Sequence, residues 1–349
     1  MSMGCRAIWR STPAGHAEMM HKAMSDTIPW STGRDARRRV LSVDPGSSIR
    51  QDAPGSCLPS RVRKGRSGFV QTHRSSLFRI FRRAAGLLLL SGATLLAHEA
   101  APPAAAAVVP KVLVYSDTGF YRHPEIPKIN RWLVLLGHEN GFEVDVTEHG
   151  KDLLPAALAP YDLLVLNNAN ELDKVLTEEE RKSVETWFAG GRKGIVGLHA
   201  ALVRQTKWPW LNQLGGCDFN SDSEFTKAKV MVDPAAKDHP AVKGQPAEFE
   251  IEADWTNHDR SVTGLPGFQV LLRVDESSYQ PVREHFLTRG GKPMGKDHPI
   301  AWTHEPATGG RFFYTEFGHD LRSLSTPFVR RHILEGIRWA GRLPTMAVE

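Results

Sequence analysis

Gly194-Ile-Val-Gly-Leu-His-Ala-Ala201 is the stretch of sequence that decides the fold. Its apolar part, Gly194 to Leu198, contains β-branched residues and is bounded by glycines, a pattern typical of a short buried strand. The strand runs into His199, and the two alanines after it are small enough for the chain to turn sharply. In open α/β sheets, ligands bind beyond the carboxyl ends of the strands. His199 is therefore either placed to meet a substrate or is a buried histidine whose ring nitrogens are both satisfied.

Upstream of this stretch, strand-like and helix-like segments alternate. That alternation predicts right-handed βαβ units and a mostly parallel sheet flanked by helices. Thr177 and Glu180 have the spacing of a capping box and predict the start of the helix before the central strand. The expected strands span residues 111–116, 143–148 and 162–168, and the expected helices span residues 127–141 and 177–190.

Downstream, strand-like segments follow one another with short loops between them, which predicts extra, antiparallel strands in the second half. They span residues 229–232, 248–251, 268–274, 300–304 and 311–315. A last helix should begin after the cap Thr326-Pro327 and end near Gly341. The prediction is one α/β domain over residues 110–342.

Charge is distributed unevenly along the chain. The whole chain has a formal net charge of +5, but residues 1–107 hold 16 basic and 6 acidic residues and the remainder holds 28 and 33. The folded part is therefore mildly acidic and gives no reason to expect nucleic acid as a partner. No glycine-rich fingerprint follows the first strand, so a nicotinamide cofactor is not indicated either.

Residues 77–107 have the features of a secretory signal peptide. The basic segment Leu77–Arg83 precedes an apolar run of 14 residues, Ala84–Ala97, and a tail of small residues. A membrane span needs about 20 apolar residues, so we expect a periplasmic or secreted protein with no stable membrane span in its mature form. Residues 1–76 show no sustained period, and we expect them to be disordered or to be an extension that the natural product lacks.

Four segments carry a resemblance to a known family through their order and spacing. They are Gly119-Phe-Tyr-Arg-His123, Gly197-Leu-His-Ala-Ala201, Asp297-His-Pro-Ile-Ala-Trp-Thr-His-Glu305 and Gly310-Arg-Phe-Phe-Tyr-Thr-Glu-Phe-Gly-His-Asp320. On these segments the sequence resembles the ThuA-like (trehalose utilisation) family. The resemblance implies a flavodoxin-like, class I glutamine-amidotransferase-like fold. The chain departs from the family pattern in two places. Cys217–Asp222 lacks the family's histidine, and Glu252-Ala-Asp-Trp255 stands where the family often has Asp-Glu-x-Tyr.

Glutamine hydrolysis is not expected despite this fold. Amidotransferases of the fold carry a cysteine nucleophile, as Gly-x-Cys-x-Gly, in the turn where this chain has His199, and Ala201 replaces the second glycine. An imidazole cannot sustain the thioester chemistry. Cys217 lies too far along the chain to replace the nucleophile.

Three histidines are expected to converge at the carboxyl edge of the sheet. His123 lies in the loop after the first strand, His199 ends the central strand, and His319 follows the strand at residues 311–315. Histidine titrates near neutral pH, so these three are the predicted catalytic residues, acting as general acids and bases. Neutral imidazoles also bind divalent metals, so a metal on the same three residues stays open and no cofactor is certain.

The family resemblance implies a small-molecule sugar substrate: trehalose or a related disaccharide, 3-keto forms included. A ketone acidifies the neighbouring C–H bond, so a histidine could promote elimination or isomerisation. Two other classes stay open, a carbohydrate-binding protein without turnover and a metal-dependent hydrolase. The predicted sugar-binding residues are Arg122, Trp208, Glu316 and Asp320, with Glu316 alternatively orienting a histidine ring. The oligomeric state is not indicated.

Overall fold

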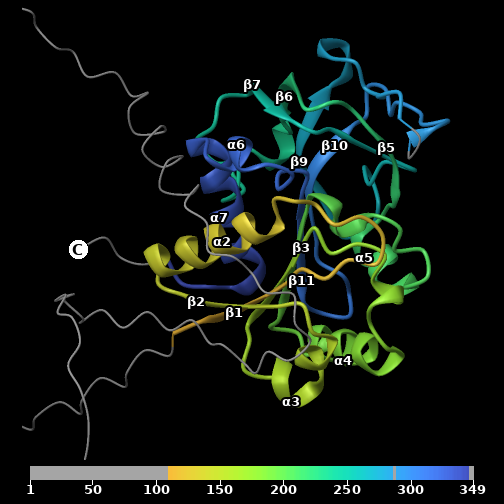
Figure 1. Cartoon of the computed structure of the whole chain (residues 1–349). Helices are drawn as coiled ribbons and strands as arrows, with labels where there is room; N and C mark the ends of the chain where they lie inside the picture. Colours follow the sequence, from red (N-terminus) through yellow and green to blue (C-terminus); the bar gives the residue numbers. More distant parts are fainter. Residues whose placement is uncertain (1–108, 286–287, 346–349) are drawn as a thin grey trace, which may run out of the picture. The chain divides into compact units, whose positions relative to one another are not determined.

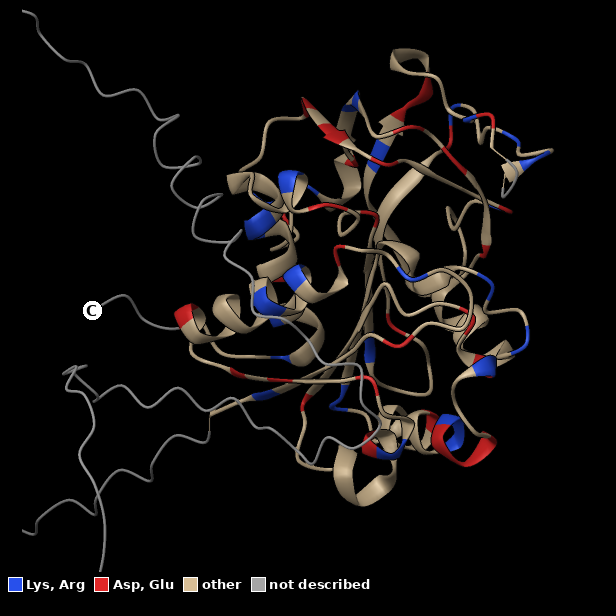
Figure 2. Ribbon diagram, in the orientation of Figure 1, with Lys and Arg blue, Asp and Glu red and all other residues tan. Residues whose placement is uncertain are grey.

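The computed structural model describes residues 109–285 and 288–345 (Figure 1). The predicted signal peptide at residues 77–107 and the predicted extension at residues 1–76 lie outside the described residues. Within the described ranges, no helix is long and apolar enough to cross a membrane. Acidic and basic residues are interspersed over the ribbon (Figure 2).

The described part of the chain is built on a nine-stranded sheet with the order β2-β1-β3-β4-β11-β10-β9-β6-β7. The first five strands are parallel to one another, and their order, 2-1-3-4 followed by one later strand, is the doubly wound order of flavodoxin. The predicted mostly parallel α/β fold is confirmed. These strands are β1 (Lys111–Tyr115), β2 (Glu143–Thr147), β3 (Leu163–Asn167), β4 (Gly194–Leu198) and β11 (Arg311–Thr315).

The other four strands extend the sheet antiparallel to their neighbours, as predicted for four of the five second-half segments. The prediction was wrong for residues 311–315, because β11 pairs with β4 in parallel and so belongs to the parallel part of the sheet. They are β10 (Pro299–His304), β9 (Phe268–Asp275), β6 (Thr226–Val232) and β7 (Glu248–Ala253). A separate ribbon of two short antiparallel strands, β5 (Phe219–Asp222) and β8 (Thr256–His258), was not predicted from the sequence. β8 follows β7 after only two residues, so the ribbon is tied directly to the edge of the sheet.

Helices cover both faces of the parallel strands because successive side chains of a buried strand point to opposite faces. On β1, Val112 and Val114 belong to one apolar cluster, and Leu113 and Tyr115 belong to the other. The first cluster includes α2 (Ile126–Asn140) and α7 (Pro327–Gly341), and the second includes α3 (Pro155–Leu158), α4 (Glu178–Ala189) and α5 (Pro209–Gly215). Figure 1 shows α2 and α7 on one side of the sheet and α4 and α5 on the other.

The helix ends follow the local signals in the sequence. Thr177 and Glu180 form the predicted capping box at the start of α4, and Thr326 accepts a hydrogen bond from the backbone of Val329 at the start of α7. Gly141 ends α2 with a φ of 78°, a left-handed conformation that glycine adopts without steric cost. The helix α6 (Leu321–Leu324), between β11 and α7, was not predicted.

Candidate functional site

The turn after β4 holds His199 in an unusual backbone conformation. Its φ is 47°, in the left-handed region that residues with a side chain rarely adopt, whereas Leu198 before it is extended. A Cβ atom added at Gly197 would lie 3.2 Å from the Cβ of Ala201 and 3.1 Å from the ring of Tyr314. The turn is therefore tight enough to need small residues at positions 197 and 201. It resembles the strained elbow that presents a nucleophile at the top of an α/β sheet, with an imidazole in its place.

The structure brings His123, His199 and His319 together, and the predicted convergence is confirmed. The centroids of the His199 and His123 rings are 4.9 Å apart, as are those of His199 and His319, and His123 lies 5.2 Å from His319. The three residues follow the parallel strands β1, β4 and β11, whose carboxyl ends share one edge of the sheet. We call these three residues the histidine cluster.

The ring nitrogens of the histidine cluster face one another. His199 Nε2 lies 3.3 Å from His123 Nε2 and 3.1 Å from His319 Nδ1. His123 and His199 are 8% and 5% exposed, whereas the His319 side chain is 31% exposed. The cluster is therefore open to solvent on the side of His319.

Glu316, the first residue after β11, orients the ring of His199. Its Oε1 accepts a hydrogen bond of 2.9 Å from His199 Nδ1 and a second one from the hydroxyl of Thr256. The hydroxyl of Tyr314 lies 2.9 Å from the other oxygen, Oε2. Glu316 is only 1% exposed. Of the two roles open to it from the sequence, the structure favours holding the imidazole over binding a sugar hydroxyl.

Asp254 is the residue of the site that sequence reasoning missed. It follows β7, and its Oδ2 lies 3.0 Å from His319 Nδ1 and 3.9 Å from His199 Nε2. Its other oxygen, Oδ1, is buried and has no hydrogen-bond partner among the described residues. A signal was present, because Asp254 lies in the stretch Glu252–Trp255 that matches the Asp-Glu-x-Tyr segment of the family.

A second buried carboxylate, Asp222, lies at the end of β5. Arg283 binds it in a bidentate pair, with Nε 2.8 Å from Oδ1 and Nη2 2.5 Å from Oδ2. Burial and the nearby Asp254 raise the pKa of Asp222 to about 6, although Arg283 opposes the shift. For Asp254 itself, burial acts to raise the pKa, but the hydrogen bond with His319 and the charge of His199 lower it overall.

The histidines of the cluster differ in their affinity for protons. Burial and the neighbouring His199 and His319 lower the pKa of His123 to about 2, so its ring is neutral at physiological pH. Burial acts in the same direction on His199, but the hydrogen bond and charge of Glu316 outweigh it and raise the pKa of that ring. With Asp254 and Glu316 buried beside it, the pocket favours a positive charge, either a proton or a metal ion.

The cluster has donor atoms placed to hold a metal. One nitrogen from each of the three histidines lies within 4.8 Å of the others. Four-coordinate zinc binds ring nitrogens at about 2.0–2.1 Å, which separates neighbouring donors by roughly 3.3–3.4 Å. The distances of 3.3 Å and 3.1 Å from His199 Nε2 are close to that spacing.

Of the other predicted sugar-binding residues, Trp208 is not brought to the cluster. It is 4% exposed within the core cluster of α3, α4 and α5, and its Nε1 donates to Glu185 of α4. Arg122 lies one residue before His123 and pairs with Glu148 at 2.5 Å. Asp320 lies one residue after His319, caps α6 and binds Arg322 at 3.0 Å. Arg122 and Asp320 are therefore direct sequence neighbours of two histidines of the cluster.

Cys217 lies in the core and not at the elbow. It is 1% exposed, and burial together with the nearby Asp259 raises the pKa of its thiol well above the ordinary value. A thiol in such a setting is a poor nucleophile because the thiolate is the reactive form.

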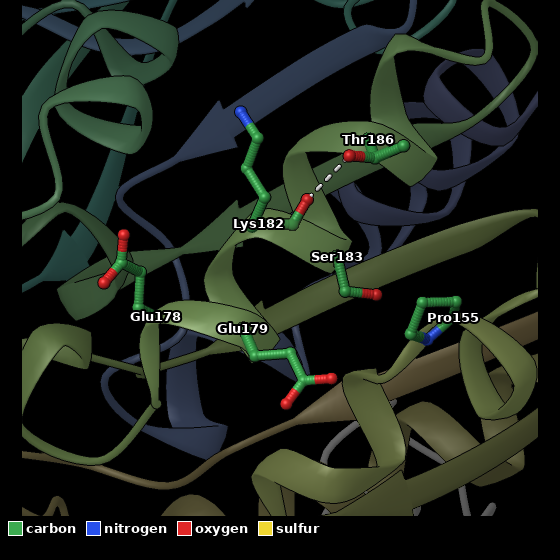
Figure 3. A pocket seen from close by; sticks show the side chains of 6 residues that line it. All are labelled: Pro155, Glu178, Glu179, Lys182, Ser183 and Thr186. Atoms are coloured by element: carbon green, nitrogen blue, oxygen red, sulfur yellow. Dashed lines mark hydrogen bonds between the residues drawn. The ribbon is translucent and has the colours of Figure 1, made fainter.

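A hollow of about 500 Å³ lies against α4, and none of the three histidines lines it (Figure 3). Pro155 and five residues of α4 line it, and the hydroxyl of one of them, Thr186, donates 2.8 Å to the carbonyl of Lys182. None of its lining residues belongs to the histidine cluster or contacts it in the interactions above. We therefore place the candidate site at the cluster.

Comparisons with known proteins agree with this fold. The family model described as "ThuA: Trehalose utilisation" matches residues 111–340. A putative ThuA-like protein from Bacteroides uniformis ATCC 8492 is 24% identical, with a TM-score of 0.56, and covers 68% of this chain and 95% of its own. A second one, from Parabacteroides merdae ATCC 43184, is 20% identical, with a TM-score of 0.51 and coverage of 69% and 93%. No curated protein matches the sequence.

Proposed function

Because the chain belongs to the ThuA, or trehalose utilisation, family, we propose that it is an enzyme acting on trehalose or a related disaccharide, 3-keto forms included. The observation that carries the proposal is the pair of Glu316 and His199 at the carboxyl edge of the sheet. An ionised carboxylate can only accept, so it fixes the proton of a neutral His199 on Nδ1 and leaves the lone pair on Nε2. That lone pair faces the two other rings and the open side of the cluster.

This arrangement suits elimination next to a ketone. In a 3-keto disaccharide, a base removes the proton from C2, and the electron pair moves into the C3 carbonyl as an enolate. When that pair returns, the bond from C1 to the glycosidic oxygen breaks, and the oxygen takes a proton from an acid. The products are an unsaturated keto sugar and a free sugar, and no water is consumed. His199 is the proposed base, and the more exposed His319, 3.1 Å away, is the proposed acid.

The test is incubation of the purified protein with trehalose and with 3-keto-trehalose, followed by mass spectrometry of the products. We expect release of free glucose from the keto sugar together with an unsaturated partner. Release of intact 3-keto-glucose, which is heavier than the unsaturated partner by one water, would instead indicate hydrolysis. Binding of either sugar without any product would indicate a carbohydrate-binding protein.

A metal-dependent mechanism is the second candidate, favoured by the spacing of the three ring nitrogens. In this case His123, His199 and His319 would be ligands, and Glu316 behind His199 would be the partner that fixes a ligand's tautomer. A divalent metal would polarise a carbonyl or lower the pKa of a bound water. Metal analysis of the purified protein separates the candidates, because about one ion per chain that is lost in His199→Ala supports the second.

We also propose that the protein acts outside the cytoplasm, on the strength of the leader sequence at residues 77–107. Cleavage is expected between Ala97 and Pro110. N-terminal sequencing of the protein recovered from the periplasm or medium tests this, and a mature chain that begins upstream of Leu77 would rule it out.

A further inference from the structure

We propose that the open side of the histidine cluster is a two-sided sugar subsite, in which Tyr121 stacks on a pyranose ring and Arg322 binds its hydroxyls. This inference rests on the proposed function and names the residues that would recognise the substrate. Neither residue was among the sugar-binding residues predicted from the sequence. The aromatic residue in that prediction, Trp208, is buried in the core.

Tyr121 is an exposed aromatic ring on a fixed backbone. Its side chain lies edge-on to His123, with ring centroids 4.8 Å apart, and the residue is 47% exposed. Asn170, which is fully buried, accepts hydrogen bonds from the N–H groups of Phe120 and Tyr121 and donates one of 2.7 Å to the carbonyl of Tyr121. An aromatic platform whose backbone is already ordered loses little conformational entropy when a ligand stacks on it.

Arg322 is connected to His319 through the ring of Phe225. Its guanidinium sits 3.9 Å from the ring centroid of Phe225, and that ring is 6.2 Å from the ring of His319. Asp320 holds one end of the guanidinium at 3.0 Å, while the Arg322 side chain is 58% exposed. A guanidinium has five N–H donors in one plane, so a single carboxylate contact leaves donors for the oxygens of a ligand.

A pyranose ring matches both sides. It has an apolar face of C–H groups, which stacks on an aromatic ring, and a rim of hydroxyls, which accept hydrogen bonds from planar donors. The only histidine of the cluster that is more than a tenth exposed is His319, so a sugar held between Tyr121 and Arg322 would meet the cluster through that ring.

The experiment is isothermal titration calorimetry of the full chain with trehalose and with 3-keto-trehalose as probes. Tyr121→Ala should weaken binding at least tenfold, whereas Tyr121→Phe, which keeps the ring, should stay within about threefold of the parent. Phe120→Ala is the matched control, because Phe120 is the adjacent exposed aromatic but stacks on Arg204. Arg322→Ala should also weaken binding, and Arg322→Lys, which keeps the charge but not the plane, should restore only part of it.

The outcomes separate this inference from the proposed function. If the parent protein binds the sugar and Tyr121→Ala binds it equally well, the subsite is wrong while the proposed function stands. If Tyr121→Phe loses as much affinity as Tyr121→Ala, the hydroxyl binds the sugar and the stacking role is wrong. If the parent protein binds neither probe, the substrate class and the subsite both fail.

Discussion

The parallel and antiparallel halves of the sheet contribute different chemistry to the same site. The segments that follow the parallel strands β1, β4 and β11 carry the three histidines of the cluster. The antiparallel half, through β7 and the ribbon that follows it, delivers Asp254 and Thr256, an acidic oxygen and a hydroxyl donor. The doubly wound fold thus supplies the three imidazoles, and the added strands supply Asp254, which contacts His319, and Thr256, which donates to Glu316.

The largest effect is expected from breaking the contribution of the parallel half. His199→Asn keeps a polar side chain but removes the nitrogen that faces the other rings, so turnover of 3-keto-trehalose should fall about 100-fold or more. Steady-state kinetics measure this, with His138→Asn as the control because His138 is an exposed residue of α2. A variant that keeps more than a third of the parent turnover would remove His199 from the mechanism.

The contribution of the antiparallel half should be next in size. Asp254→Asn keeps the shape of the side chain but removes the charge beside His319 and His199. Loss of such a supporting carboxylate typically costs about 10- to 100-fold in activity or metal affinity. Glu252→Gln, two residues earlier and exposed, is the matched control. If both variants behave like the parent, the added strands are only a structural extension.

A smaller effect is expected at Thr256, which acts on the ring of His199 only through Glu316. Thr256→Val removes the hydroxyl that donates to Glu316 Oε1, and turnover should fall about three- to tenfold because the carboxylate is less well held. Thr256→Ser retains the hydroxyl and should restore most of the activity. If Ser is as impaired as Val, the methyl group and its packing matter, and the positioning role is wrong.

His332 of α7 provides the contrast of a histidine that is buried and fully satisfied. Its Nδ1 lies 3.0 Å from the carbonyl of Ala241 and its Nε2 lies 3.1 Å from the hydroxyl of Thr315. Burial lowers its pKa to about 4, and the charge of His239 adds to the shift. The unfolded chain titrates near 6.5. Between these values the unfolded state therefore binds more protons, and His332 favours unfolding as the pH falls from about 6.5 towards 4.

Denaturant unfolding of the parent and of His332→Gln at pH 7.5 and 4.5 measures this contribution. The parent should lose up to about 3 kcal/mol more of its free energy of unfolding than the variant does over that range. Turnover at pH 7.5 should be the same in both where the variant remains folded. An equal loss in the two proteins would mean that His332 does not carry the pH dependence.

The position of the histidine cluster was predictable because it depends on topology alone. His123, His199 and His319 each follow a strand whose apolar run is visible in the sequence, and parallel strands place their carboxyl ends at one edge. The same reasoning located α4 from the box of Thr177 and Glu180. Local patterns of this kind need no knowledge of distant contacts.

The residues that surround the cluster were harder to predict from the sequence. β8 has three residues, Thr256–His258, without a hydrophobic alternation, so nothing in the sequence marks it as the strand that brings Thr256 to the site. Trp208 was predicted to bind sugar, but it is buried among residues of α3, α4 and α5. The sequence does not show this, because the exposure of a side chain depends on which face of the sheet its element covers. Tyr121 stays exposed because Asn170, some 50 residues later, fixes its loop.

The histidines of the cluster are far apart in the sequence, so the site can assemble only late during translation. His123 and His199 are 76 residues apart, and His199 and His319 are 120 apart. At roughly 5–20 residues per second, translation of the stretch between the first and third histidines takes about 10–40 s. A nascent chain that has just completed the turn after β4, His199–Leu202, carries two of the three rings but lacks β11, Glu316 and the third ring. The complete histidine cluster is therefore assembled late in synthesis, and a product that ends before β11 would lack both Glu316 and His319.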